Sequence, residues 1–537
     1  MPNRLKGSPI LQFDSTIPGV PLPKEVENLI PTCLQRCREF GLDYYPPVCE
    51  MLEFDHMSEV AAYNGFPVRY PHWRFGMEYE DLAHRYNYGM QRIYEMVINT
   101  SPFCYIYLLK SNDLIDHVTV IVHALGHSHF FKNNIYFKPT DGNMMNIMAD
   151  NGSRIRRYMA RWGRDKVTKF IDHVLRIQTL IDPSSGWDIK KVSQVIKRDS
   201  RTFREMRRFK VGEDRSYLDD WINTPEWKEF ERKRIEKEDI AEQLDLFGDP
   251  ERDIFKYLRD HCKFKPWEQD IISMLYGESL YFAPQGATKV INEGFASWVD
   301  YKMIACEGMA ALGQKHPDQG IIHYAKHKMG VLGGKYSMNP YKLGFSILMD
   351  IEERWNKGKF GQEWDDCKDL REREKWDKKL GQGKEKVFEV VDLENDFTLI
   401  AKYFTQELCA KMEFFESKWY PNGLKKLEGR DYKNIKTKLL QRHIHRGLPD
   451  IRLTDPNHMN KGWFLMQHFA DKDDLRPLHE PYLKEVLPSI YHLWGNTVVL
   501  ESRTSAGEPI VWACDGDTPE HVVMMKRSEY EEKYLKK

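Results

Sequence analysis

Two histidines four residues apart, His123 and His127, lie in the apolar segment VTVIVHALGHSHFFKNN at residues 118–134. On an α-helix this spacing places both imidazoles on one side, about one turn apart, so that both can bind one metal ion. His129 stands just beyond the pair. Because the chain has 19 histidines, the spacing alone is a weak signal. The alternative is a buried helix whose histidines are hydrogen-bonded to other groups.

This segment lacks the glutamate of a zinc peptidase. In a His-Glu-x-x-His motif the glutamate acts as general base toward the metal-bound water, whereas this chain has Ala124 at that position. Two other carboxylates, Glu268 and Glu278, are candidate replacements. Glu278 lies in an aromatic and apolar run, where burial would raise its pKa toward a useful range. We therefore predict Glu278 as the candidate catalytic base, with a purely structural carboxylate as the alternative.

A candidate third ligand, Glu293, lies in the stretch INEGFASWVDY at residues 291–301. This stretch resembles the segment of gluzincin aminopeptidases in which the glutamate of an Asn-Glu-Gly-Phe-Ala-Ser-Trp run binds zinc. Two neutral imidazoles and one carboxylate leave a fourth position for water, which is the catalytic arrangement of zinc. We predict a divalent metal site, with zinc favoured. Its ligands would be His123, His127 and Glu293, with His129 as a further candidate.

One feature of the chain separates this candidate site from gluzincin peptidases. Glu293 follows the two histidines at a far greater distance along the chain than in those enzymes. A shared site therefore requires the fold to bring together segments on either side of a long insertion.

A second histidine pair, His323 and His327, precedes a Gly333-Gly334 loop. The loop lacks the lysine-serine ending of a phosphate-binding loop, so nucleotide binding is only weakly indicated. The run HIHRG at 443–447 lacks neighbouring ligand residues, and we interpret it as surface.

The elements that must position these residues are mostly helices. Residues 24–45 and 77–98 show helical spacing of apolar side chains. A buried helix is predicted to begin after Ser111 or Asn112, which are plausible N-caps, and to include both histidines of the first pair. Residues 103–110 are aromatic and β-branched, which fits either a strand or the start of an apolar helix.

Toward the C-terminus the pattern becomes mixed. Residues 385–396 suggest a strand, 397–416 a helix, and 497–517 a hairpin with Gly507 in its turn. We predict an α+β fold that is predominantly α-helical, with a zincin-like helical N-terminal and central region and a small α+β C-terminal domain. The predicted ranges are 1–160 for the first part of the main helical domain, 161–262 for a charged helical insertion, 263–378 for the remainder of the main domain, and 379–537 for the C-terminal domain.

Composition limits the function classes. The net charge of −1 gives no overall field that would attract nucleic acid or anionic lipid. No run of about 18 apolar residues is present, so we expect no membrane span. The N-terminal residues do not resemble a secretory signal. The nine cysteines are scattered without a Cys-x-x-Cys pair, which favours a reducing cytoplasm.

Several long blocks together resemble one family, the SpoVR family of stage V sporulation protein R and its relatives. The blocks are residues 61–82, 88–109, 123–134, 281–298 and 339–361, and the similarity extends from about residue 24 to about residue 520. His123 and His127 match the family's His-x-x-x-His motif. Many members have an acidic residue where this chain has His129.

The resemblance implies a cytoplasmic protein linked, in spore formers, to formation of the spore cortex, a peptidoglycan layer. It also implies association with a serine kinase of the PrkA type and that kinase's companion protein. The resemblance indicates a biological process but no specific chemical reaction. Two hypotheses follow: a metal-dependent hydrolase of peptide or amide bonds, and a non-catalytic regulatory or scaffold protein acting with the kinase system.

Overall fold

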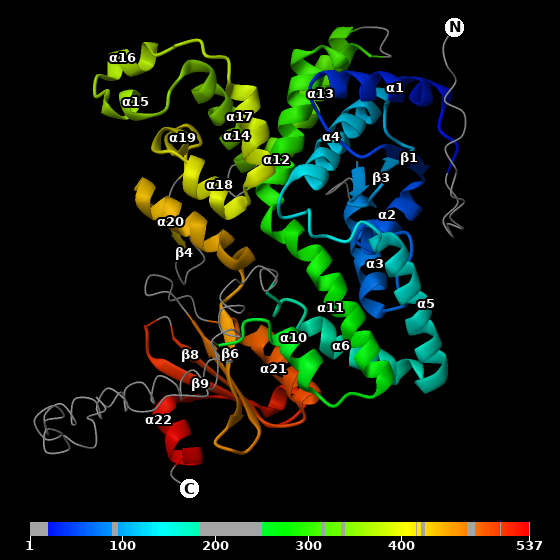
Figure 1. Ribbon diagram of the computed structural model, residues 1–537, viewed down its shortest axis with the longest axis vertical. Coiled ribbons are helices and arrows are strands. Elements are labelled where there is room, and N and C mark those ends of the chain that lie inside the picture. The colour runs from blue at the N-terminus through cyan, green and yellow to red at the C-terminus, as the bar shows by residue number, and fades with distance from the viewer. Residues whose placement is uncertain are drawn as a thin grey trace, which may run out of the picture. The chain divides into compact units, whose positions relative to one another are not determined.

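The computed structural model describes residues 20–87, 95–182, 250–312, 317–333, 339–414, 416–419, 425–469, 478–504 and 506–535. Helices predominate and the sheets are small, which confirms the predicted α+β class (Figure 1). The chain divides into two compact units, one made of residues 1–168 and 280–447, the other of 169–279 and 448–537. Most of the predicted charged insertion falls in 183–249, outside the described residues. The four ranges given above stay predictions.

The first unit contains a three-stranded sheet in the order β1 (Pro47–Leu52), β3 (Cys104–Leu109), β2 (Glu95–Ile98). β3 pairs parallel with β1 and antiparallel with β2. Because side chains alternate along a strand, Ile106 and Leu108 join one hydrophobic cluster and Tyr107 and Leu109 another. The sequence spacing wrongly predicted helix through residue 98, since the pairing of β2 with β3 depends on a neighbour that local periodicity cannot reveal.

Helix α4 (Leu114–Asn133) carries the first histidine pair. Its N-cap is Asp113, which directly follows the two predicted candidates, Ser111 and Asn112. The Asp116 carboxylate accepts a hydrogen bond from the Asp113 backbone N–H at 3.3 Å. Every residue of 117–131 is buried, because the helix lies between the small sheet and α12 (Figure 1). The predicted buried helix is confirmed.

Helix α12 (Lys289–Asp300) carries Glu293 and packs between α4 and α14 (Pro340–Lys357). Glycines make both contacts close. A Cβ atom added at Gly126 of α4 would lie 3.0 Å from the Ala296 Cα, and one added at Gly344 of α14 would lie 2.0 Å from the Val290 carbonyl oxygen. A side chain at either glycine would push α12 away from its neighbour.

Other helices complete the first unit. They are α1 (Lys24–Glu39), α2 (Phe54–Ala62), α3 (Trp73–Asn87), α5 (Met144–Trp162), α13 (Pro317–Leu332), α15 (Gln362–Asp366), α16 (Leu370–Lys375), α17 (Gly383–Leu393), α18 (Asp396–Tyr403), α19 (Gln406–Lys411) and α20 (Tyr432–His443). A π-helical turn continues α12 at Tyr301–Cys306, short 3-10 turns lie at Met309–Ala311 and Ile444–Gly447, and β4 (Glu416–Trp419) pairs with β5 (Lys425–Gly429).

The strand suggested at residues 385–396 is wrong, because α17 occupies most of this range. Val387, Val390 and Val391 are buried at helical spacing, and their packing against the core outweighs the preference of valine for strands. The predicted helix at 397–416 forms as two short helices, α18 and α19.

The second unit is built on a five-stranded sheet in the order β10-β9-β8-β7-β6. Its strands are β6 (Ile451–His458), β7 (Trp463–His468), β8 (Val498–Arg503), β9 (Pro509–Cys514) and β10 (Val522–Lys526). β8 and β9 form the predicted antiparallel hairpin, with Gly507 at φ +84° in the turn. The unit also holds α10 (Ile254–His261), α21 (Glu480–Trp494), α22 (Arg527–Tyr530), a 3-10 turn at Pro519–His521 and a π-helical turn at Glu531–Leu535. The boundaries between units fall within α6 (Arg164–Arg176) and α11 (Pro266–Ala287).

The close α12–α14 contact gives a stability prediction. Gly344→Ala should lower the free energy of unfolding by about 1–3 kcal/mol, because the new methyl group overlaps the Val290 carbonyl. Chemical denaturation of the full chain measures this. Gly330→Ala in α13 is the matched control, since its added Cβ would meet nothing within 4 Å. Equal stability of both variants would show that the glycine contact does not constrain α12.

Candidate metal centre

The structure brings His123, His127 and Glu293 together at one point between α4 and α12. The Glu293 Oε2 atom lies 3.4 Å from His127 Nε2 and 3.8 Å from His123 Nε2. The two imidazole ring centroids are 4.8 Å apart. Zinc–ligand distances of about 2.0–2.1 Å in a tetrahedral site place ligand atoms roughly 3.3 Å from one another. The three side chains therefore need only small shifts to share one ion.

The far nitrogens of both rings are held by oxygen atoms of α12. His123 Nδ1 lies 3.0 Å from Asp300 Oδ2, and His127 Nδ1 lies 2.8 Å from Asn292 Oδ1. An ionised carboxylate and an amide oxygen can only accept hydrogen bonds, so each Nδ1 carries the proton and donates it. In each neutral ring the lone pair is then on Nε2, the atom that faces Glu293.

Asp300 is itself fixed by α13. Its Oδ1 accepts hydrogen bonds from the Tyr324 hydroxyl and the Lys328 ammonium, both at 2.7 Å. Burial by itself raises the pKa of Asp300, but the hydrogen bond from His123 and the charge of Lys328 outweigh it and hold that pKa below its ordinary value. Asp300 therefore stays a carboxylate behind His123.

Glu293 is also held in its charged form. Burial alone would raise the pKa of this carboxyl, yet the adjacent Nε2 atoms of His123 and His127, when they carry protons, hold it well below its usual range. The Oε2 atom is buried and accepts no hydrogen bond within normal geometric limits from the residues the structure describes. A carboxylate in this state is the form that binds metal ions.

The start of α12 is fixed by a residue that the sequence did not single out. The buried Asp396 carboxylate accepts hydrogen bonds from the Val290 and Ile291 backbone N–H groups, each at 2.9 Å. These two groups lie in the first turn of the helix, where backbone donors have no intrahelical partner. Asp396 thus caps, from α18, the helix that presents Glu293.

The third histidine of the segment, His129, lies apart from this group. Two residues along a helix turn a side chain by about 200°, so His129 faces away from His127. Its Nδ1 accepts the Asp43 backbone N–H at 2.9 Å, and its Nε2 is 3.6 Å from Asp392 Oδ1. His129 therefore helps to pack α4, and the structure does not place it with the other predicted ligands.

The predicted base, Glu278, is buried in α11. It belongs to the second unit, whereas the three converging residues belong to the first, so its role as a base stays a prediction. Glu268 accepts a hydrogen bond from the Lys265 backbone N–H at 3.0 Å.

The second histidine pair lies elsewhere in the first unit. His323 lies 2.8 Å from Asp116 and, with Asp113, forms a second, more exposed group of ligand-type atoms. The His327 side chain is outside the described part of the chain.

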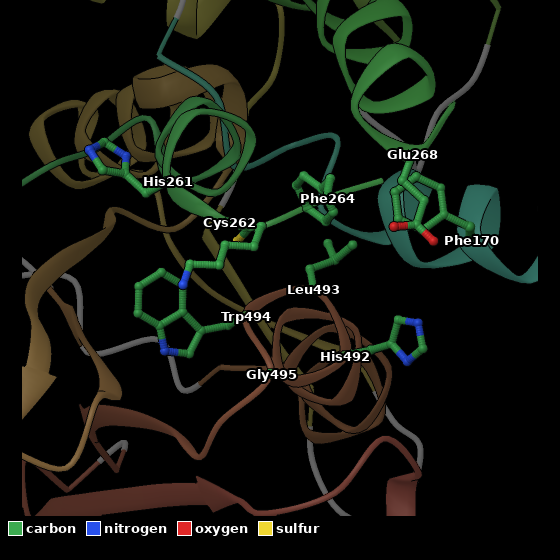
Figure 2. Close-up of a pocket in the computed structure, with 10 residues that line it drawn as sticks. Phe170, His261, Cys262, Phe264, Glu268, His492, Leu493, Trp494 and Gly495 are labelled. Carbon is green, nitrogen blue, oxygen red and sulfur yellow. The ribbon is translucent and has the colours of Figure 1, made fainter. Parts of the chain in front are cut away.

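The second unit has a cavity of about 490 Å³, and the converging residues do not line it. Its walls come from α6, the loop after α10, α11 and the end of α21 (Figure 2). His492 at this cavity stacks on His173, with ring centroids 4.1 Å apart and an interplanar angle of 17°. Burial, followed by the nearby charges of His492 and Arg176, lowers the pKa of His173 to about 4.

Comparisons with known proteins place these residues in a family context. The family model described as SpoVR like protein matches residues 22–447, a range that includes every residue of the converging group and its partners. The uncharacterized protein YcgB of Escherichia coli (strain K12) is 28% identical over 328 residues, which are 58% of this chain and 60% of the relative. The chain thus matches less than two thirds of that relative's length. No solved structure matches the chain. Among the described helices, none combines the length and apolarity needed to cross a membrane.

The buried Lys328–Asp300 pair gives a second stability prediction. Lys328→Met should lower the free energy of unfolding by about 3–5 kcal/mol, because it leaves a buried carboxylate without its cation. Denaturant titration of metal-free protein measures the loss. Lys357→Met, which breaks the exposed pair with Glu353, should have little effect. Equal losses in the two variants would contradict a special role for the buried pair.

The stacked histidines predict an acid-sensitive second unit. The pKa of His173 is lowered to about 4 in the folded chain and is about 6.5 when unfolded, so the unfolded chain binds more protons between these values. Stability should be fully present above about pH 6.5 and fall as the pH drops toward 4. Hydrogen exchange of α21 amides measures this. His173→Phe keeps a stacked ring and should reduce the pH dependence; an unchanged dependence would exclude His173 as its source.

Proposed function

The chain belongs to the SpoVR family, and we propose that it is a metal-dependent hydrolase of peptide or amide bonds that uses zinc at His123, His127 and Glu293. The observation that carries this proposal is the convergence of two Nε2 atoms and one carboxylate oxygen, all within 4.8 Å of one another. Three protein ligands leave a fourth position for water, whereas structural zinc sites have four protein ligands.

The chain's own residues would prepare such a site in three ways. Asp300 and Asn292 orient the two imidazoles, so that both lone pairs face one point. Glu293 supplies a negative charge at the same point. When bound, zinc would polarise a carbonyl group and lower the pKa of a water molecule.

The base of this hydrolase cannot be the usual one, because Ala124 stands where the motif has glutamate. Glu278 is the candidate for this role because it is a carboxylate buried in an aromatic and apolar run, and a variant tests it. Glu278→Gln would then lower the rate by roughly 10²–10⁴-fold while zinc binding stays unchanged. A full rate in this variant would reject the assignment.

The proposed substrate class rests on the link with the spore cortex that the resemblance to the family implies. We propose peptides of peptidoglycan as the first class to test, because their cross-links are amide bonds. All nine cysteines are free thiols, which supports a reducing, cytoplasmic location.

A regulatory or scaffold protein acting with a PrkA-type kinase is the second candidate. The observation that favours it is Ala124, since a protein without catalysis needs no base at this position. In that case the His–His–Glu group would hold a structural or sensory ion. Zinc binding without chelator-sensitive hydrolysis would favour this candidate over the hydrolase.

Measurement of the zinc content per chain tests whether the protein binds a metal ion. The full chain, reconstituted with zinc and freed of excess, should hold about one equivalent by elemental analysis, because three preformed donors are present. His127→Ala and Glu293→Ala should each bind much less. The matched control is His323→Ala, which removes a helical histidine bound to Asp116. Less than about half an equivalent in the wild type, or equal content in all variants, would contradict the site.

A further inference from the structure

The two histidines of the metal centre are supported by partners of different charge. His123 donates to Asp300, a carboxylate, and His127 donates to Asn292, a neutral amide. We propose that Asp300, fixed by Lys328 and Tyr324 of α13, is the positioning residue that sets metal affinity and makes His123 the stronger of the two histidine ligands. This inference rests on the proposed metal site.

The geometry leaves Asp300 no freedom to turn away. Its Oδ2 faces His123 Nδ1, while its Oδ1 accepts from both the Tyr324 hydroxyl and Lys328 Nζ. The residue is the last of α12 and is only 4% exposed. A carboxylate with both oxygens occupied holds the imidazole plane as well as its tautomer, and this defines the direction of the Nε2 lone pair.

Lys328 ties this arrangement to α13. Its ammonium also donates to the Ser297 carbonyl at 2.8 Å and lies 5.0 Å from the centre of the Phe345 ring. The lysine therefore joins α13 to the last turn of α12, and it balances the Asp300 charge from the side away from His123. Without such a cation a buried carboxylate would be costly.

The difference in charge between Asp300 and Asn292 should affect how strongly the centre binds a metal ion. Two carboxylates, Glu293 and Asp300, lie beside the imidazole pair, and Lys328 pairs with Asp300, so carboxylate oxygens surround the point where a dication would bind. An imidazole that donates to a carboxylate is also a more basic ligand than one that donates to an amide. Asn292 orients the His127 ring but adds neither a negative charge nor basicity to it. Removing the charge at position 300 should therefore weaken binding more than removing the amide at position 292.

The test is the zinc affinity of the full chain, measured by competition with a chromophoric chelator. Asp300→Asn keeps the shape of the side chain and should weaken binding about 10–100-fold. Asn292→Ala should weaken it less. Asp350→Asn is the matched control, because Asp350 pairs with Arg354 at 2.8 Å on α14 and touches neither histidine; it should bind zinc like the wild type. The absorption spectrum of the cobalt-substituted protein should change in Asp300→Asn and not in Asp350→Asn.

The outcomes separate this inference from the proposed function. A wild type that binds one zinc while Asp300→Asn binds it equally well would overturn the role of Asp300 alone. A wild type that binds no zinc would remove the metal site, and this inference with it. If Asp300→Asn does not fold, Tyr324→Phe replaces it, since that change deletes one hydrogen bond to Asp300 and keeps every charge. Several-fold weaker binding is then expected, and unchanged affinity would overturn the proposal.

Discussion

The close packing of α12 against α4 is the constraint on which the candidate centre depends. Gly126 lies between the two histidines on the helix, and a side chain there would meet the backbone of α12 at Ala296. On the other side, Gly344 allows α14 to press against Val290. With α12 held between two helices, Glu293, Asn292 and Asp300 reach both sides of the imidazole pair. The residue between the histidines therefore matters as well as the histidines themselves, because Gly126 lets α12 come close enough for Glu293 to reach them.

The sequence predicted the groups that can bind a metal but not the groups that hold them. His123 and His127 stand at helical spacing in an apolar run, and Glu293 lies in a stretch that resembles a zinc-binding segment of aminopeptidases. The local sequence pattern was therefore sufficient to identify these three residues as candidate ligands. Asp300, Lys328 and Asp396 belong to segments that meet only in the folded chain. An aspartate at the end of a helix is common, and nothing in the order of residues marks its partner. For the same reason local spacing misread β2 and α17, whose conformations follow from pairing and burial.

Function depends on what the centre lacks as well as on what it holds. A donor set of two imidazoles and a carboxylate suits zinc with an open position, and the buried, charged surroundings suit a dication. Ala124 removes the base that peptidases place beside the first histidine, so any hydrolysis must use a different group as its base. The family range of 22–447 contains the centre and all of its supports, whereas the sheet of the second unit begins after it.

The most direct test of the central claim is a crystal structure of the zinc-loaded chain with anomalous diffraction recorded at the zinc edge. The account predicts one strong peak about 2.0–2.2 Å from His123 Nε2, His127 Nε2 and a Glu293 oxygen, with Asp300 and Asn292 still bonded to the far nitrogens. A peak at Asp113, Asp116 and His323 instead, or no peak between α4 and α12, would contradict it.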